Sequence, residues 1–271
     1  MINILKKLLL LILLTCLIML TETGCDEKIV GVDVNVNNTN YSATEPITYN
    51  IAVVNHSKLR LEGINGDITI SGRPGLSSVI INSEKKVSSE SVRDAESHLQ
   101  DLSVTLLDLG DEIFVKTSQP DENYGRIYVV DYDITIPDNF KVLVNNINGS
   151  IQVDSLNNSV TIIGVNGSAI LNDIFGTTVV ALINGQIKSK QSLPLNGTIS
   201  FTTVNGSIDL DIPQSTSANF SASVVNGNIN LSNLILQNEF IRTNSISGTI
   251  GNGEGTISLM TTNGTIYVTG Y

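Results

Sequence analysis

The stretch Ile147–Val153, which reads Ile-Asn-Gly-Ser-Ile-Gln-Val, decides the fold, because close variants of it recur along the second half of the chain. Asn-Gly pairs begin at positions 148, 166, 184, 205, 226 and 263, and a Ser-Gly variant begins at Ser247. With the variant counted, the successive intervals are 18, 18, 21, 21, 21 and 16 residues. A near-constant interval of this size predicts stacked units, none of which can bury its apolar face alone.

Apolar and polar residues alternate after most of these pairs. Seven of the nine Asn-Gly pairs in the chain are followed, two residues after the glycine, by isoleucine. The period of two places Ile208 and Leu210 on one face of a strand and Asp209 on the other. Asn-Gly readily adopts positive φ and therefore marks a tight corner before each strand.

Two arrangements are compatible with these corners. In an antiparallel sheet each Asn-Gly would be a two-residue hairpin, the usual role of an isolated pair. In a coil each interval would be one rung, with equivalent residues stacked in parallel about 4.8 Å apart. We favour the coil, because the regular recurrence stacks Ile on Ile and corner Asn on corner Asn. The sequence thus predicts an all-β fold, a parallel β-solenoid (β-helix) with two strands per rung of about 18–21 residues.

The 21-residue interval also predicts a register. Lys188 would lie over Asp209 on the outer face, and Lys190 would lie over Asp211. Ile208 would stack on Ile229 of the next rung. The pair Asn196-Gly197 lies within this interval and could be the neighbouring corner instead, which would break the equivalence.

The composition limits the class of partner. The 271 residues are 41% hydrophobic, contain no Trp and carry a net charge of −11. A basic patch is needed to bind nucleic acid or an anionic lipid surface, so neither is expected as a partner.

The first 24 residues predict an export signal peptide. Lys6 and Lys7 precede an apolar run from position 8 to 20, which is shorter than the roughly 20 residues that span a bilayer. A short uncleaved anchor is the alternative. Gly24-Cys25 resembles the end of a bacterial lipobox, although Glu22 stands where such motifs usually carry Leu. We therefore expect Cys25 to be lipidated and to hold the protein at a membrane, with residues 25–45 as a polar tether.

The remainder, 46–271, predicts one β-solenoid domain in two parts. In the N-terminal part, 46–140, strands begin at Pro46 and a first copy of the phrase occurs at Ile64–Ile68. Helical spacing of apolar residues and the pair Ser91 and Asp94 predict one short helix at about 91–102. The array of Asn-Gly repeats follows from 141 to 271.

The order of these features resembles a known family. LRLEGINGDITISG, the single helix, VDYDITIP and the run of NNINGSIQV-type phrases are similar to the bacterial β-strand-repeat "putative adhesin" family, a domain of unknown function related to the head domain of auto-transporter adhesins. The resemblance covers about 46–271 and implies an exported or membrane-associated β-solenoid without established catalytic residues.

The residues do not predict an enzyme. Catalytic sites in solenoids need convergent carboxylates or bound cations, and among the few acids of the array only Asp209 and Asp211 share a face. His56 and His98 have no metal-ligand spacing, and the Gly-rich turn that starts at Gly251 lacks the Lys of a phosphate loop. We expect no catalytic, metal-binding or cofactor-binding residues, and no cofactor.

The sequence therefore predicts a lipid-anchored protein of the cell envelope whose exposed Asn, Ser and Thr face binds an envelope protein or a glycan, or serves as a structural module. The alternatives are a carbohydrate-active enzyme of the envelope and an accessory to envelope-stress signalling.

Overall fold

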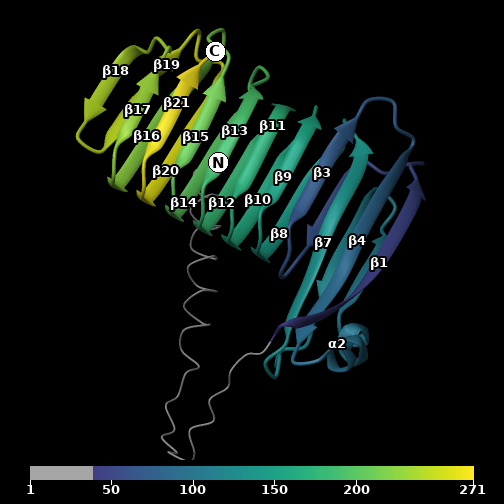
Figure 1. The fold of residues 1–271 in the computed structure, drawn as a ribbon. Coiled ribbons are helices and arrows are strands. Elements are labelled where there is room, and N and C mark those ends of the chain that lie inside the picture. The colour runs from purple at the N-terminus through teal and green to yellow at the C-terminus, as the bar shows by residue number, and fades with distance from the viewer. Residues whose placement is uncertain (1–38) are drawn as a thin grey trace, which may run out of the picture. The chain divides into compact units, whose positions relative to one another are not determined.

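The computed structural model describes residues 39–271, and its strands form a coil of stacked rungs (Figure 1). Each rung contributes one strand to each of two sheets, which we call sheet A and sheet B. The strands of sheet A are β1 (Tyr41–Ala52), β3 (Ile68–Arg73), β4 (Ser78–Ser89), β7 (Ile127–Pro137), β9 (Ile151–Leu156), β11 (Ala169–Phe175), β13 (Ile187–Ser192), β15 (Ile208–Ile212), β17 (Ile229–Ser232) and β21 (Ile266–Gly270).

The strands of sheet B lie on the other side of the core. They are β2 (Lys58–Glu62), β5 (Ser103–Asp108), β6 (Glu112–Ser118), β8 (Lys141–Asn148), β10 (Val160–Asn166), β12 (Thr178–Asn184), β14 (Thr198–Asn205), β16 (Ala218–Asn226), β18 (Gln237–Arg242), β19 (Ser245–Ile250) and β20 (Gly255–Asn263). The strand order is β1-β4-β7-β3-β9-β11-β13-β15-β21-β17 in sheet A and β18-β19-β16-β20-β14-β12-β10-β8-β2-β6-β5 in sheet B.

The pairing of successive rungs is parallel, which confirms the coil and excludes the hairpin sheet for the array. Strand β10 pairs in parallel with β8 and β12, and β11 does so with β9 and β13. In this register Asn166 lies between Asn148 and Asn184. The Asn-Gly pairs at Asn148, Asn166 and Asn184 are therefore corners at which the chain passes from sheet B to sheet A.

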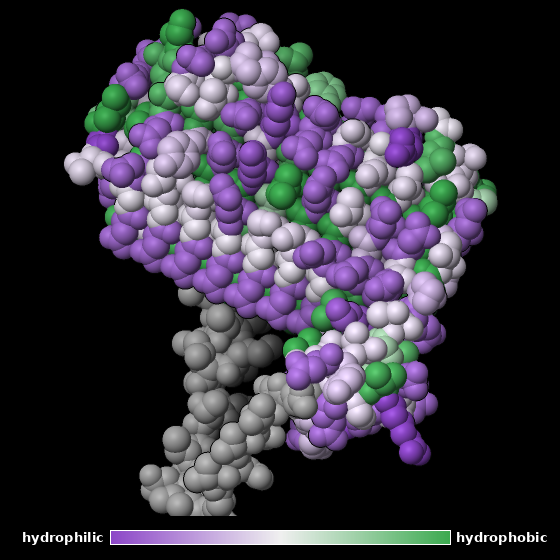
Figure 2. Space-filling model, in the orientation of Figure 1, coloured by the Kyte–Doolittle hydropathy of each residue, from purple (hydrophilic) through white to green (hydrophobic). Residues whose placement is uncertain are grey.

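The corner asparagines form a continuous ladder of hydrogen bonds along the coil. The spatial order of the ladder is Asn65, Asn148, Asn166, Asn184, Asn205, Asn263 and Asn226, and from Asn148 onward each side-chain amide nitrogen donates to the amide oxygen of the preceding corner at 2.6–2.8 Å. Figure 2 shows a regular hydrophilic row along the edge where the sheet A strands of the array begin. Stacked amides of this kind stabilise repeated strands and tie each rung to the next.

The core lies between the sheets and consists of rows of inward-facing apolar side chains, each row made of equivalent positions on adjacent strands. Ile187, Ile208 and Ile266 are fully buried and occupy equivalent positions on adjacent strands of sheet A. On sheet B, Ile199 and Ile257 stack in the same way. The predicted faces are confirmed, since inward Ile and Leu alternate with polar outward residues in these strands.

The C-terminal rung occupies a position that its place in the sequence does not predict. Strands β20 and β21 lie between β14–β15 and β16–β17, and all of these pairings are parallel. Ile266 therefore separates Ile208 from Ile229, and the prediction that these two residues stack directly is wrong. Every rung presents the same Asn, Gly and apolar rows, so the last rung fits into the gap without breaking the ladder.

The Ser-Gly variant at Ser247 is not a corner. It lies in β19, which runs antiparallel to β16 and pairs with β18 to cover the end of sheet B. The pair Asn196-Gly197 is also outside the ladder, in the turn before β14, where the Gly197 N–H donates to the carbonyl of Pro194 at 2.9 Å. It does not break the equivalence of Asn184 and Asn205, which are Cα partners.

The N-terminal part adds two further rungs and a cap. Strands β2 and β3 stack on β8 and β9, and β6 and β7 stack on the other side of β2 and β3. Beyond them β4 runs antiparallel to β7 and β1, and β5 runs antiparallel to β6. The first copy of the phrase is a true corner, because Asn65 begins the ladder.

Two predicted boundaries shift in this part. The helix α2 spans Val92–His98 and continues as the 3₁₀-helix η1 (Leu99–Asp101), and the Ser91 side chain accepts from the Asp94 N–H at 3.1 Å, as its capping role predicts. Strand β1 begins at Tyr41, so residues 41–45 belong to the sheet and not to a tether. Glu45 pairs there with the buried Lys85 at 2.6 Å, a long-range contact that the polar sequence does not reveal.

Candidate ligand-binding surface

Charged and aromatic side chains gather on the outer face of sheet A, toward the C-terminal end of the coil. They come from three adjacent strands, β13, β15 and β21. We call this set the Tyr–Asp–Lys surface, and its members are Lys188, Lys190, Asp209, Asp211, Tyr267 and Tyr271. Their side chains point away from the core because the intervening Ser189, Leu210 and Val268 are buried.

The register of the strands brings these side chains into rows. Lys188 is the Cα partner of Asp209, and Lys190 is that of Asp211, which confirms the register predicted from the 21-residue interval. On the other side Asp209 is the partner of Tyr267. One row across the face therefore reads Lys, Asp and Tyr at strand spacing.

The Tyr–Asp–Lys surface exists only because the last rung is inserted into the coil. In chain order, β17 would follow β15, and Asn230 would lie beside Asp209. The insertion of β21 places Tyr267 there instead, with 47% of its surface exposed. The sequence analysis identified Asp209 and the lysines but missed both tyrosines, since their nearness to β15 depends on the insertion.

Tyr271 adds a second exposed ring. Its backbone N–H donates to the Ile212 carbonyl at 3.0 Å, which fixes the chain terminus against the end of β15. The Lys190 Nζ lies 5.0 Å from the centre of the Tyr271 ring, although β13 and β21 are separated by β15. The ring therefore reaches toward β13 in a cation–π contact, and 53% of the residue remains exposed.

The charged groups of this surface have hydrogen-bonding capacity that the described part of the chain does not use. Among residues 39–271, no ion pair within 4.0 Å includes Lys188, Lys190, Asp209 or Asp211. Asp154, nearer the middle of sheet A, differs. It accepts from Gln152 at 2.7 Å and from Asn172 at 2.8 Å. The four charged side chains of the Tyr–Asp–Lys surface are thus available to bind a ligand.

The electrostatics of the surface depend on the two carboxylates. Partial burial raises the pKa of Asp209 above its ordinary value, and the nearby negative charge of Asp211 raises it further, while Lys188 opposes the shift. Two Lys and two Asp cancel in formal charge. The surface is consequently polar and dipolar but carries no net charge.

The outer face of sheet B differs from the exposed Asn, Ser and Thr face that the sequence predicts. Over strands β8, β10 and β12 its outward positions are largely apolar and include Leu143, Ile163, Val179 and Ile183, all partly exposed. The polar outer face of the solenoid is therefore restricted to sheet A in this region.

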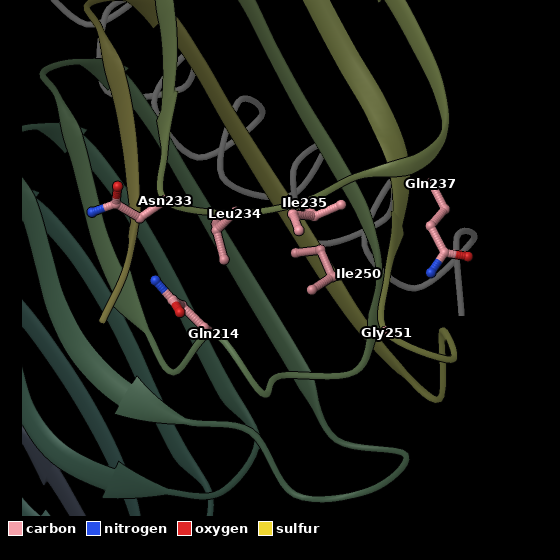
Figure 3. Close-up of a pocket in the computed structure, with 7 residues that line it drawn as sticks. All are labelled: Gln214, Asn233, Leu234, Ile235, Gln237, Ile250 and Gly251. Atoms are coloured by element: carbon pink, nitrogen blue, oxygen red, sulfur yellow. The ribbon is translucent and has the colours of Figure 1, made fainter.

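A recess of about 550 Å³ opens at the C-terminal end of the coil (Figure 3). In Figure 3, Ile235 lies beside Ile250, and Gln214 faces Leu234. The recess is lined by seven residues, none of which is titratable: Gln214, Asn233, Leu234, Ile235, Gln237, Ile250 and Gly251. A second recess of about 470 Å³ is lined by the single acid Glu254 together with Asn252 and with apolar and hydroxyl residues. Neither recess has the paired carboxylates of a hydrolytic site.

The other residues considered in the sequence lie apart from one another. His56 Nε2 is 3.0 Å from Asp108, and His98 Nδ1 is 2.8 Å from the carbonyl oxygen of Asp94 on its own helix. Glu239 is exposed on β18. In the described part of the chain, no group of three or more His, Cys, Asp and Glu is arranged to hold a metal ion.

The predicted lipidation site, Cys25, and the predicted signal peptide lie outside the described residues. From residue 39 onward, no helix has the length and apolar character of a membrane-spanning segment.

A parallel solenoid with a continuous apolar core, a hydrogen-bonded corner ladder and an open polar face is a scaffold for presenting a surface. The chain belongs to the Toastrack DUF4097 family, whose model matches residues 27–269. This confirms the resemblance to a domain of unknown function and the β-solenoid-like fold.

The chain also matches solved structures at low sequence identity. A "putative cell adhesion protein" from Clostridium sporogenes is 13% identical, with 84% of this chain and 100% of that chain covered and a TM-score of 0.45. A "putative adhesin" from Bacteroides fragilis is 12% identical over 85% and 99% of the two chains, with a TM-score of 0.28. A "putative lipid binding protein" from Parabacteroides distasonis is 10% identical over 84% and 98%, also with a TM-score of 0.28. No curated protein matches this chain in sequence.

Proposed function

We propose that this protein is an exported lipoprotein of the cell envelope, held at a membrane by acyl chains on Cys25, and that its solenoid is an adhesin-type binding module. The apolar run before Gly24-Cys25 supports export and anchoring. Acyl chains contribute about 0.8 kcal/mol per buried CH₂, so two or more of them hold a protein stably at a bilayer.

The observation that carries the binding function is the Tyr–Asp–Lys surface. On strands β9 and β11 of the same sheet, the polar side chains of Gln152, Asp154 and Asn172 bond to one another. Here four charged groups and two exposed rings lie on adjacent strands of a rigid sheet, and none of the charges forms an ion pair within the described chain. Exposed aromatic groups beside open polar groups are typical of recognition surfaces.

We infer a binding module and not an enzyme, because no described cleft combines two carboxylates with a proton acceptor. Asp209 and Asp211 lie on a flat outer face, and Glu254 is the one acid of the second recess. Hydrolysis of a glycosidic bond typically uses two carboxyl groups that flank the bond. Release of reducing ends from envelope glycans by the wild type, but not by Asp209→Asn, would contradict this inference.

The anchor is tested by metabolic labelling of cells with a fatty-acid probe. The wild type should be labelled and Cys25→Ala should not. Equal labelling of both would show that Cys25 carries no acyl chain.

The binding face is tested by retention of envelope material on the purified protein. The double variant Tyr267→Ala, Asp209→Ala should lose a specific component that the wild type retains. Tyr124→Ala is the matched control, since Tyr124 is 79% exposed but belongs to the loop before β7. Identical retention by all three proteins would remove the support for this face.

A further inference from the structure

The Tyr–Asp–Lys surface has the chemistry of a glycan site, and this inference rests on the binding function proposed above. We propose that its ligand is a neutral oligosaccharide that lies across β13, β15 and β21, with sugar rings stacked on Tyr267 and Tyr271 and hydroxyl groups bound by the Asp and Lys side chains between them.

The two tyrosines are spaced for a ligand of more than one sugar unit. Their Cα atoms lie four residues apart along the chain, which corresponds to about 13 Å at about 3.3 Å per residue of extended chain, and Tyr271 directly follows β21. Both rings are about half exposed, at 47% and 53%. The C–H face of a pyranose is apolar and can cover an aromatic ring, and burial of that surface favours binding.

The polar groups between the rings match the hydroxyl rim of a sugar. Each carboxylate of Asp209 and Asp211 only accepts hydrogen bonds, and each ammonium of Lys188 and Lys190 only donates them. Sugar hydroxyls do both, so neighbouring hydroxyls can bind an Asp and the Lys beside it at the same time. The register supplies such Asp–Lys pairs twice, at positions two residues apart along the strands.

The charge balance selects a neutral ligand. Two Lys and two Asp leave no local excess of either sign, while the whole chain carries a net charge of −11. An acidic glycan would be repelled by the whole protein without a compensating basic patch. A neutral oligosaccharide avoids this cost and uses all four groups.

The flat shape of the face is consistent with an extended chain and not with a single sugar. The site lies on the outer face of a sheet rather than in a cleft. Because a flat surface covers only one side of a ligand, several sugar units must bind together to reach useful affinity.

The test is calorimetric titration of the full chain, kept in a detergent without a sugar head group, against neutral trisaccharides. The probes are linear trisaccharides of glucose, galactose, mannose and N-acetylglucosamine. At least one should bind the wild type, and Tyr267→Ala and Tyr271→Ala should each weaken that binding about tenfold, equivalent to about 1.4 kcal/mol. Asp209→Ala should weaken it as well, whereas Tyr124→Ala should bind like the wild type.

Thermal unfolding of each variant shows whether it is folded, and these exposed substitutions should leave the transition unchanged. Absence of binding for every trisaccharide would overturn the glycan inference, as would binding that survives both tyrosine substitutions. If the wild type still retains an envelope protein through the same face, the proposed function stands and only the glycan assignment fails. If no envelope component depends on Tyr267 and Asp209, the proposed binding face fails too.

Discussion

Replacement of the corner glycine Gly149 by alanine should be far more costly than the same replacement at a glycine outside the ladder. Gly149 has φ +127°, and a Cβ at this position would lie well under 3.0 Å from the carbonyl oxygen of Gly66 on the adjacent rung. Gly75 also has positive φ, +71°, but a Cβ there meets nothing within 4 Å. The two substitutions differ in the contact between rungs, and φ at Gly149 also lies further from the left-handed region that L residues can adopt.

The expected difference follows from separate contributions. Positive φ costs an L residue about 1–2 kcal/mol, which is the whole effect at Gly75. At Gly149 the methyl group must push a backbone oxygen, and overpacking of this kind costs about 1–3 kcal/mol more. Movement of the rungs would also strain the Gly149 N–H bond to Asn166 and the Asn146 bond to Gly66, each worth about 1 kcal/mol. We therefore expect Gly149→Ala to cost about 2–4 kcal/mol more than Gly75→Ala.

Urea unfolding followed by far-UV circular dichroism measures both losses. The wild type and the two variants should show similar slopes, and the midpoint should fall much further for Gly149→Ala. If the two variants lose the same stability, the corner glycines are not in tight contact, and the close stacking of the rungs is refuted.

Three further predictions concern the core, the inserted rung and the cap. Ile208→Asp should lower stability by about 3–5 kcal/mol, because it buries an unpaired charge between Ile187 and Ile266. Asp209→Asn should change stability little. Similar losses for the two variants in chemical denaturation would mean that the inward and outward faces of β15 are reversed. Truncation after Glu254 removes β20 and β21, through which β16 and β17 contact the array. Hydrogen exchange should therefore show lost protection at 218–250 and retained protection at 141–192. Continued protection of β16 would indicate that β16 stacks directly on β14. Hydrogen bonds from Arg126 and Ser89 hold the pKa of Asp94 well below its usual range. The Asp94 carboxylate therefore binds a proton less tightly in the folded state than in the unfolded state. Its contribution to folding stability is present above about pH 4 and is lost as the pH falls further. At pH 7, Asp94→Asn should lower stability by about 1 kcal/mol, because the pair is partly exposed, and the difference in melting temperature from the wild type should shrink toward pH 2; a difference independent of pH would contradict this origin.

The repeat phrase determined the corners, the faces and the parallel register of the array from β8 to β15. Asn-Gly supplies the corner, the period of two assigns Ile208 to the core and Asp209 to the surface, and equal intervals place Lys188 over Asp209. These properties are local or periodic, so they can be read from a single sequence. The helix cap at Ser91 was predictable for the same reason, since it depends on residues three positions apart.

The position of the last rung was decided only by the tertiary structure. Every rung offers the same Asn ladder, glycine corner and row of Ile, so local chemistry permits a rung to stack on any other. The antiparallel β18 and β19 cover the far end of β16, and the chain returns through residues 251–254 to the open side of β16, next to β14. The candidate surface depends on this choice, because Tyr267 and Tyr271 reach the Asp and Lys side chains only through the inserted β21. The sequence does not show which of several equivalent rungs a distant rung will pair with. It does show the period and the corners that make the rungs equivalent.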